Sequence, residues 1–242
     1  MLACVYRPWV LSDKMCPVKE AVAFAKGYSF PSGHSATASS VLGGVAFLQR
    51  HNIMKCLLLV ILVLLVGFSR LWLGVHTPQD VVFGFLTGLT LIFITHFVIN
   101  WAEKDKNRYL YLLAIINIFA LFALIYVCYF NTCRMDYVNG ELLVNPTKQI
   151  YAMVVCVGYA LGLVNGAMLC RRFFPFNPQT SSKKARITRG IIGGILAILL
   201  LRKILQPIFF SVIDFKIAFA VSIIIGLFLT LIYPIIFTKL EK

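Results

Sequence analysis

The stretch of residues 56–99, CLLLVILVLLVGFSRLWLGVHTPQDVVFGFLTGLTLIFITHFVI, decides the fold of this chain. It contains two apolar runs, Cys56–Val75 and Val81–Ile99, with the polar residues His76–Asp80 between them. The first run is interrupted by charge only at Arg70, near its end, and the second contains no Asp, Glu, Lys or Arg. Because about 20 predominantly apolar residues span the hydrocarbon core of a bilayer as a helix, each run predicts a transmembrane helix.

The composition of the whole chain is that of a membrane protein. Of its 242 residues, 60% are hydrophobic and 13% are charged, whereas soluble domains average about 45–50% apolar and about 25% charged residues. The formal charge of +14 comes from short basic clusters that lie between uncharged apolar runs. Such clusters are typical of topology signals in membrane proteins, so we expect no nucleic acid partner.

Other segments of the chain predict further spans. Three of them contain no charged residue, and these are Tyr109–Phe130, Ile150–Cys170 and Ile217–Phe237. Ser35–Leu48 is short and rich in small residues. Ile187–Leu205 carries basic residues near both ends, where long side chains can reach the membrane interface. The sequence therefore predicts an all-α fold, a polytopic transmembrane helical bundle of about seven spans.

The distribution of basic residues predicts how this bundle is oriented. Consecutive spans alternate in direction, so 13 of the 23 Lys and Arg residues fall on one face and 10 on the other. The six basic residues between Cys170 and Gly190 decide the assignment, because excess positive charge marks the cytoplasmic side. The opposite face, which holds Met1–His34, the turn at Arg70–Asp80 and the connection Asn131–Gln149, is therefore expected to look outward.

The reactive polar residues all fall on this outward face. They form three groups: Arg7 with Pro8; the run Pro31-Ser32-Gly33-His34 at the start of a helix; and Ser69-Arg70 with His76-Thr77-Pro78-Gln79-Asp80. Alternation of the spans therefore brings groups that are far apart in sequence to one membrane surface. Asp136 and Glu141 lie in the outward connection Asn131–Gln149, which we expect to be a solvated loop; the alternative is a loop that covers the site.

The cationic members of these groups suit phosphate. Arg7 and Arg70 carry planar, permanently charged forks that match phosphate oxygens. Ser32, Gly33 and His34 stand at a helix N-terminus, where free backbone N–H groups and the helix dipole favour an anion. Glycine allows the backbone to come close to such a ligand.

The two histidines and the aspartate suit transfer of that phosphate. His76 can attack phosphorus, and Asp80 can orient its ring and stabilise the charged form. His34 is then the natural general acid for the leaving oxygen. Positive charge around the equatorial oxygens stabilises the transition state, so the set predicts phosphoryl transfer.

Each group also has a purely structural interpretation. Thr77, Pro78 and Asp80 make a good helix start, with Thr77 as the N-cap. On that interpretation His76 is an interfacial residue and the two arginines are interfacial anchors. The interpretations are compatible, because an aspartate in a first helical turn points back toward the preceding histidine. The gathering of all the groups on one face favours the functional interpretation.

In these residues the chain resembles the type 2 phosphatidic acid phosphatase family. The family signature is a lysine, six residues and Arg-Pro; then Pro-Ser-Gly-His; then Ser-Arg, five residues, a histidine, three residues and an aspartate. Apart from the lysine, the order and spacing match over about Met1–Trp101. The resemblance implies a helical membrane fold and a phosphohistidine mechanism without a metal or other cofactor. It implies His76 as nucleophile, Asp80 as its partner, His34 as acid, and Arg7, Ser32, Gly33 and Arg70 as the phosphate cradle.

The resemblance also predicts how the chain is organised. Residues 1–101 are expected to form the phosphatase core that carries the motifs, and residues 102–242 to add C-terminal transmembrane helices. The lysine of the signature would stand just before Met1, and the family core has helices ahead of the first motif. We therefore expect an N-terminally truncated form.

The expected activity is hydrolysis of a lipid phosphate or pyrophosphate, such as phosphatidic acid, phosphatidylglycerol phosphate or a polyprenyl diphosphate. Two alternatives stay open: a lipid phosphotransferase of the same family, and a transporter or scaffold that binds lipid headgroups without catalysis. The expected partner is a lipid phosphate substrate. We expect a multi-pass protein of a bacterial cell membrane whose site faces away from the cytoplasm.

Overall fold

The computed structural model describes residues 4–25, 27–105, 107–130, 135–138, 140–174, 182–205 and 214–240. The chain divides into two compact units, which are described separately below. The first comprises Met1–Trp101 and Cys133–Asn145, and the second comprises Ala102–Thr132 and Pro146–Lys242. Helices dominate both units, so the predicted all-α membrane fold is confirmed as a class.

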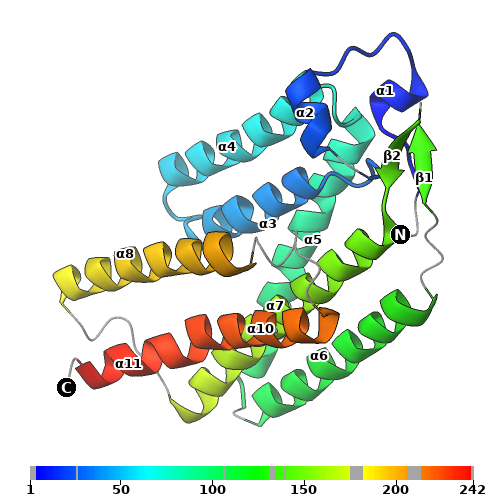
Figure 1. Cartoon of the computed structure of the whole chain (residues 1–242). Helices are drawn as coiled ribbons and strands as arrows, with labels where there is room; N and C mark the ends of the chain where they lie inside the picture. Colours follow the sequence, from blue (N-terminus) through cyan, green and yellow to red (C-terminus); the bar gives the residue numbers. More distant parts are fainter. Residues whose placement is uncertain are drawn as a thin grey trace. The chain divides into compact units, whose positions relative to one another are not determined.

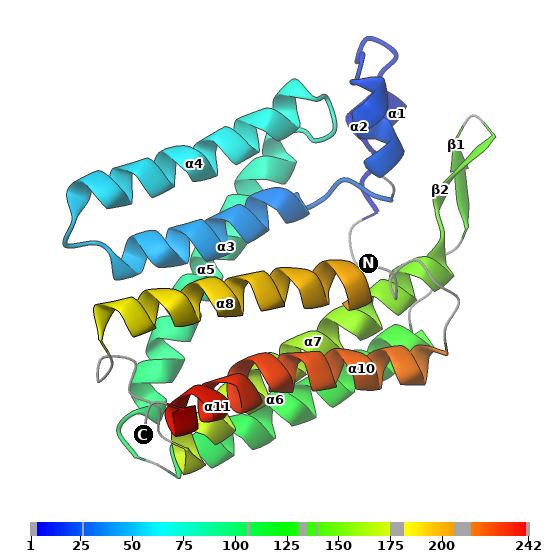
Figure 2. The same cartoon turned by 60° about the vertical axis from the view of Figure 1, so that its left-hand side comes forward.

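The first unit is built from helices and one β-hairpin (Figure 1). Its elements are α1 (Pro8–Leu11), α2 (Lys19–Phe24), α3 (Gly33–Leu48), α4 (Ile53–Trp72), α5 (Pro78–Ala102), β1 (Asp136–Val138) and β2 (Glu141–Val144). The helices α3 and α4 run side by side (Figure 2). Because they are antiparallel and α5 follows α4 directly, the start of α3, the end of α4 and the start of α5 lie at the same end of the unit.

Side-chain caps define where these helices begin. Ser32 caps α3, with the Ser35 backbone N–H 3.4 Å from its Oγ. Thr77 and Asp80 form a reciprocal capping box at the start of α5. The Thr77 hydroxyl accepts from the Asp80 backbone N–H at 3.3 Å, and the Asp80 carboxylate accepts from the Thr77 backbone N–H at 2.7 Å. The predicted helix start at Thr77 and Pro78 is therefore confirmed.

Two glycines of α5 allow that helix to approach α3 closely. A Cβ at Gly84 would lie 2.7 Å from the Ser32 carbonyl oxygen, and one at Gly88 would lie 2.5 Å from the Ser39 Cβ. The Ser39 hydroxyl also donates to the Phe85 carbonyl oxygen across the same contact, at 3.0 Å. Close packing at these glycines therefore sets the distance between the starts of the two helices.

The β-hairpin corrects the expectation of a loop at Asn131–Gln149, although side chains such as Tyr137 are exposed as expected. Strands β1 and β2 pair antiparallel, with Tyr137 opposite Leu142 and Val138 opposite Glu141. Gly140 adopts a positive φ of 82°, which glycine tolerates without strain. The sequence pair Asn-Gly favours a two-residue hairpin turn, and it accounts for this difference.

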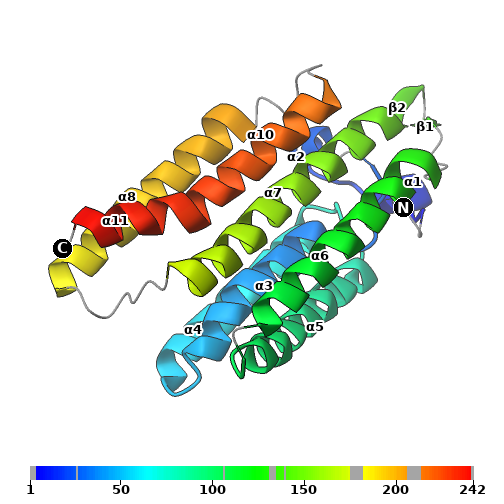
Figure 3. The ribbon, with the colours of Figure 1, turned by 90° about the horizontal axis from the view of Figure 1, so that it is seen from below.

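The second unit consists of helices (Figure 3). Its elements are α6 (Arg108–Ile125) with the π-helical turn η1 (Tyr126–Phe130), α7 (Pro146–Phe173), α8 (Lys183–Leu200) with η2 (Leu201–Leu205), α10 (Phe215–Leu227), η3 (Phe228–Ile232) and α11 (Tyr233–Leu240). The helices α7 and α10 pack through small residues. A Cβ at Gly162 of α7 would clash with the Ile223 carbonyl oxygen of α10. Small residues on both helices therefore allow their backbones to come close, as is usual between membrane helices.

Five helices of the described residues are long and apolar enough to cross a membrane. They are Ile53–Trp72, Pro78–Ala102, Arg108–Tyr129, Pro146–Phe173 and Phe215–Lys239. The other two predicted spans also form helices. However, α3 has 16 residues, about 24 Å at 1.5 Å per residue, against a hydrocarbon core of about 30 Å. The helix α8 carries four basic residues within its 18. The predicted number of about seven spans is therefore approximate.

The glycine contact predicts how a single methyl group would change stability. Gly84→Ala places a Cβ against the backbone of α3, and such overpacking costs about 1–3 kcal/mol. We expect a thermal unfolding midpoint several degrees below that of the unmodified protein in detergent, followed by circular dichroism. Gly44→Ala is the matched control, because its Cβ would meet its nearest atom, Ile92 Cγ1, at 4.0 Å. Equal midpoints for the two variants would contradict the packing role of Gly84.

Candidate active site

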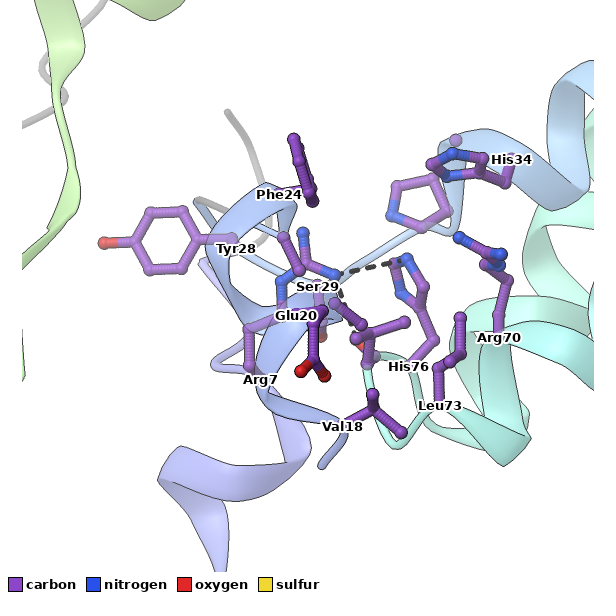
Figure 4. A pocket seen from close by; sticks show the side chains of 15 residues that line it. Arg7, Val18, Glu20, Phe24, Tyr28, Ser29, His34, Arg70, Leu73 and His76 are labelled. Atoms are coloured by element: carbon purple, nitrogen blue, oxygen red, sulfur yellow. Dashed lines mark hydrogen bonds between the residues drawn. The ribbon is translucent and has the colours of Figure 1, made fainter. Parts of the chain in front are cut away.

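A cavity of about 550 Å³ opens in the first unit where α3, α4 and α5 meet at one end (Figure 4). Five of the seven predicted site residues line it, and these are Arg7, Gly33, His34, Arg70 and His76. The remaining wall includes the apolar side chains of Val18, Phe24 and Leu73. Ser32 and Asp80 are buried next to these lining residues. The structure therefore brings together groups that are up to 69 residues apart in sequence.

The imidazole of His76 has a charged side chain next to each of its nitrogen atoms. Arg7 Nη1 lies 3.2 Å from Nε2, and Asp80 Oδ2 lies 3.5 Å from Nδ1. A guanidinium can only donate, so Nε2 accepts and the proton of the neutral ring belongs on Nδ1, facing the carboxylate. This tautomer leaves the Nε2 lone pair as the nucleophilic position of the ring.

The carboxylate of Asp80 is fixed by several contacts and is only 1% exposed. Oδ2 accepts from the Thr77 backbone N–H at 2.7 Å, and Oδ1 lies 3.3 Å from the Ser29 hydroxyl. The Asp80 carbonyl oxygen accepts from the Ser32 N–H at 3.0 Å, which ties the start of α5 to that of α3. The same Oδ2 atom serves the helix cap and faces His76, so the capping and orienting interpretations both hold in one geometry.

Arg7 is 7% exposed and is held by backbone oxygens from two separate segments. Its Nε donates to the Gly27 carbonyl at 3.0 Å, and its Nη1 donates to the Val75 carbonyl at 2.9 Å. These bonds aim the guanidinium at His76, which immediately follows Val75. Arg7 therefore lies in the wall of the cavity, with its guanidinium next to His76.

His34 and Arg70 also belong to the polar wall of the cavity, which includes the carboxylate of Glu20 as well. His34 stands in the first turn of α3, and Arg70 stands in the last turn of α4 with its Nε 3.2 Å from the Ser69 hydroxyl. Their side chains extend toward the same space as His76 (Figure 4). Two histidines and two arginines from four segments thus surround a single volume.

Ser32 differs from the other predicted cradle residues because it does not line the cavity. Its hydroxyl accepts from the Ser35 hydroxyl at 3.0 Å and caps α3. Its backbone N–H is occupied by the Asp80 carbonyl. In this structure Ser32 therefore fixes the helix start, while Gly33 and His34 present the first turn to the cavity.

Ser29 is a residue of the site that sequence reasoning missed. It is 1% exposed, and its hydroxyl lies 3.1 Å from the Tyr6 carbonyl and 3.3 Å from Asp80 Oδ1. Its single proton can serve one of these acceptors at a time. In the sequence Ser29 is visible only as a serine three residues ahead of Ser32. Serine is common in loops, so its presence there does not by itself indicate a site residue.

The electrostatics of the cavity favour uncharged histidines. Burial, and then the charge of Arg7, lower the pKa of His76 to about 4, although Asp80 acts in the opposite direction. Burial, Arg70 and Arg7 also lower the pKa of His34. His76 is therefore neutral at physiological pH, which is the form required of a nucleophile.

Within the described part of the chain, no group of three His, Cys, Asp or Glu side chains is placed to hold a metal ion. The positive charge around the cavity comes from the two arginines and from the N-terminal turn of α3.

The fold and the site together define a polytopic membrane protein with a histidine–aspartate–arginine site at one end of its helices. Comparison with known families agrees with this description. Residues 1–105 match the model of the PAP2 superfamily, and residues 154–242 match that of the PAP2 superfamily phosphatase transmembrane extension. The chain belongs to the PAP2 superfamily.

Two curated relatives illustrate the similarity. Phosphatidylglycerophosphatase B of Bacillus subtilis (strain 168) is 34% identical over 115 residues, which are 44% of this chain and 54% of the relative. Undecaprenyl-diphosphatase of Sulfolobus acidocaldarius is 38% identical over 68 residues, which are 28% of this chain and 32% of the relative. The matches thus span about half of the first relative and a third of the second. No significant match to a solved structure was found.

The lowered pKa of His76 predicts a titration that can be measured without substrate. Because the pKa is about 4, the ring should stay neutral as the pH falls through 6.5 and gain its proton only near pH 4. Selective ¹⁵N labelling of histidine, with NMR in detergent micelles, follows the ring directly. Arg7→Gln removes a neighbouring positive charge, so the pKa should rise toward its ordinary value. A midpoint near 6.5 in the unmodified protein would contradict the electrostatic description of the site.

Proposed function

We propose that this protein is a membrane phosphatase that removes phosphate from a lipid phosphate or pyrophosphate through a phosphohistidine at His76. The observation that carries the proposal is the position of the His76 ring between Asp80 on Nδ1 and Arg7 on Nε2. A site for binding headgroups alone would need positive charge, but it would not need a buried carboxylate that orients an imidazole. The names of the two curated relatives support the same reaction class.

In the first step the phosphoryl group occupies the cavity beside the guanidinium groups of Arg7 and Arg70. The N–H groups of the first turn of α3 add to the cradle, and Ser32 supports it by starting that helix. Arg7 exchanges its hydrogen bond to Nε2 for one to a phosphate oxygen, which frees the lone pair. Nε2 then forms a bond to phosphorus while the bond from phosphorus to the leaving oxygen breaks. The negative charge of the bound phosphate offsets the two arginines and favours the protonated form of His34, which gives that oxygen a proton.

In the second step water takes the place of the departed alcohol or lipid phosphate. Neutral His34 accepts a proton from this water as its oxygen attacks phosphorus, and the N–P bond breaks. His76 returns to its neutral form, and inorganic phosphate leaves. Asp80 stabilises the imidazolium-like ring of the intermediate, because its carboxylate faces Nδ1.

The walls of the cavity support a lipid as the carrier of the phosphate. Val18, Phe24 and Leu73 line one side of it, and the side chain of Phe24 is 90% exposed. Apolar side chains next to a cationic cradle suit a substrate with a charged head and a hydrocarbon tail. Phosphatidic acid, phosphatidylglycerol phosphate and a polyprenyl diphosphate all have this form.

We further propose that the cavity opens on the extracytoplasmic face of a bacterial cell membrane. The distribution of Lys and Arg supports this orientation, because the larger basic clusters fall at the opposite ends of the helices. A lipid phosphate in the outer leaflet then reaches the site without crossing the bilayer.

Substitution of the histidines tests the mechanism. His76→Ala should lower phosphate release on the order of 10⁴-fold or more and abolish a ³²P-labelled phosphoenzyme trapped from a labelled lipid phosphate. His34→Ala should slow formation of the phosphoenzyme by about 10²–10⁴-fold, with the greatest loss for poor leaving groups. His51→Ala, at an exposed turn between α3 and α4, is the matched control. Substantial turnover by His76→Ala would rule out the phosphohistidine.

Thiol labelling tests the orientation. In a variant with Cys4, Cys16 and Cys133 replaced by serine, a cysteine at Asp13 in the first loop should react with an impermeant maleimide added outside intact cells. A cysteine at Ser182, before α8, should react only after the cells are opened. The reverse pattern would place the cavity on the cytoplasmic side.

A further inference from the structure

The hairpin β1–β2 belongs to the first unit although its neighbours in sequence, α6 and α7, belong to the second. It lies between residues 105 and 154, outside both matched family regions. Val144, at the end of β2, is completely buried. The hairpin is therefore a packed part of the unit that carries the cavity.

Both strands of the hairpin bind consecutive residues of the loop that leads to α3. The Gly27 backbone N–H donates to the Leu143 carbonyl of β2 at 2.9 Å. The Tyr28 hydroxyl donates to Asp136 Oδ2 of β1 at 3.1 Å. Because Tyr28 lines the cavity, this second contact reaches the wall of the site itself.

The peptide groups of Gly27 connect the hairpin to Arg7. The Gly27 N–H is bound by β2, while its carbonyl oxygen accepts from Arg7 Nε at 3.0 Å. Gly27 has a φ of 82°, a left-handed conformation that lets it satisfy both contacts without a side-chain clash. If the hydrogen bond from the Gly27 N–H to Leu143 were broken, the backbone of Gly27 could rotate. Its carbonyl oxygen would then no longer point at the guanidinium of Arg7.

A second connection runs through the two tyrosines. The Tyr28 ring packs edge-on against that of Tyr6, with centroids 5.7 Å apart, and Tyr6 directly precedes Arg7. The interaction with Asp136 raises the pKa of Tyr6, and burial together with Asp136 raises the pKa of Tyr28. Both hydroxyls therefore stay protonated, as donors to a carboxylate must.

We propose that the β1–β2 hairpin is a positioning element of the active site, which holds Gly27 and Tyr28 so that Arg7 remains aimed at His76. This inference rests on the proposed function and adds to it a segment from outside the motif-bearing region. The hairpin does not touch the phosphate. It acts through Arg7, because a cradle group that is loosely held loses much of its effect on the transition state.

The test compares three variants that each change the hairpin contacts. Asp136→Ala removes the acceptor of the Tyr28 hydroxyl, Tyr28→Phe removes the donor, and Asp136→Asn keeps an oxygen that can accept. Tyr137→Phe is the matched control, because it removes a hydroxyl from the same strand where the side chain is 59% exposed. The readouts are kcat/KM for a short-chain lipid phosphate and the inhibition constant of orthovanadate, a mimic of the transferred phosphoryl group.

We expect Asp136→Ala and Tyr28→Phe to lower kcat/KM by about tenfold or more, the loss typical of one hydrogen bond to a charged group. Vanadate inhibition should weaken to a similar degree, and Asp136→Asn should recover much of both. Tyr137→Phe should match the unmodified protein. In an Arg7→Ala background the hairpin substitutions should cost nothing more, since contacts that act through one residue are not additive.

Two results would overturn the inference. One is unchanged kcat/KM and vanadate inhibition in both Asp136→Ala and Tyr28→Phe. The other is a full additional loss in the Arg7→Ala background, which would show that the hairpin supports the fold generally. If Asp136→Ala does not fold, Tyr28→Phe decides alone, because it removes one oxygen atom.

Absence of phosphate release by the unmodified protein would instead count against the proposed function. Vanadate binding, measured calorimetrically, would then decide the role of the hairpin.

Discussion

The bracing of the His76 ring between a carboxylate and a guanidinium is the interaction on which the rest of the site depends. Asp80 faces Nδ1 and Arg7 faces Nε2, so one neutral tautomer is selected and its lone pair is directed. Both partners are almost fully buried, and charges in such surroundings interact much more strongly than they would in water. The low pKa of His76 follows from the same burial and from the same arginine.

Helix packing brings these groups together at one end of the unit. Gly84 and Gly88 bring α5 against α3, and the hydrogen bond from the Ser32 N–H to the Asp80 carbonyl joins the starts of the two helices. The capping box then fixes the Asp80 carboxylate on the His76 side. Structural and catalytic demands therefore fall on the same atoms, which explains why the capping and functional interpretations of these residues do not compete.

The geometry also separates catalysis from simple recognition of a headgroup. Positive charge and a helix N-terminus are sufficient to bind phosphate, and a transporter or scaffold would need no more. A second histidine across the cavity and an imidazole next to a buried carboxylate are features that the proposed phosphoryl transfer uses and that binding alone does not need. The Gly27 and Val75 carbonyls bind the side chain of Arg7, and the Gly27 N–H is bound in turn by the hairpin. The position of Arg7 therefore depends on segments that are distant from it in sequence.

The sequence alone determined the helical membrane class, the start of α5 at Thr77 and Pro78, and the set of polar groups at one end of the helices. These follow from local properties: the length of apolar runs, capping chemistry and the alternation of spans. Tertiary structure decided the tautomer of His76, the capping position of Ser32, and the contacts of Ser29 and Asp136 with the site. The Asn-Gly signal could have revealed the hairpin, but not that it binds Gly27 and Tyr28. Contacts between residues more than 100 positions apart depend on how the helices pack, and no local pattern records that packing.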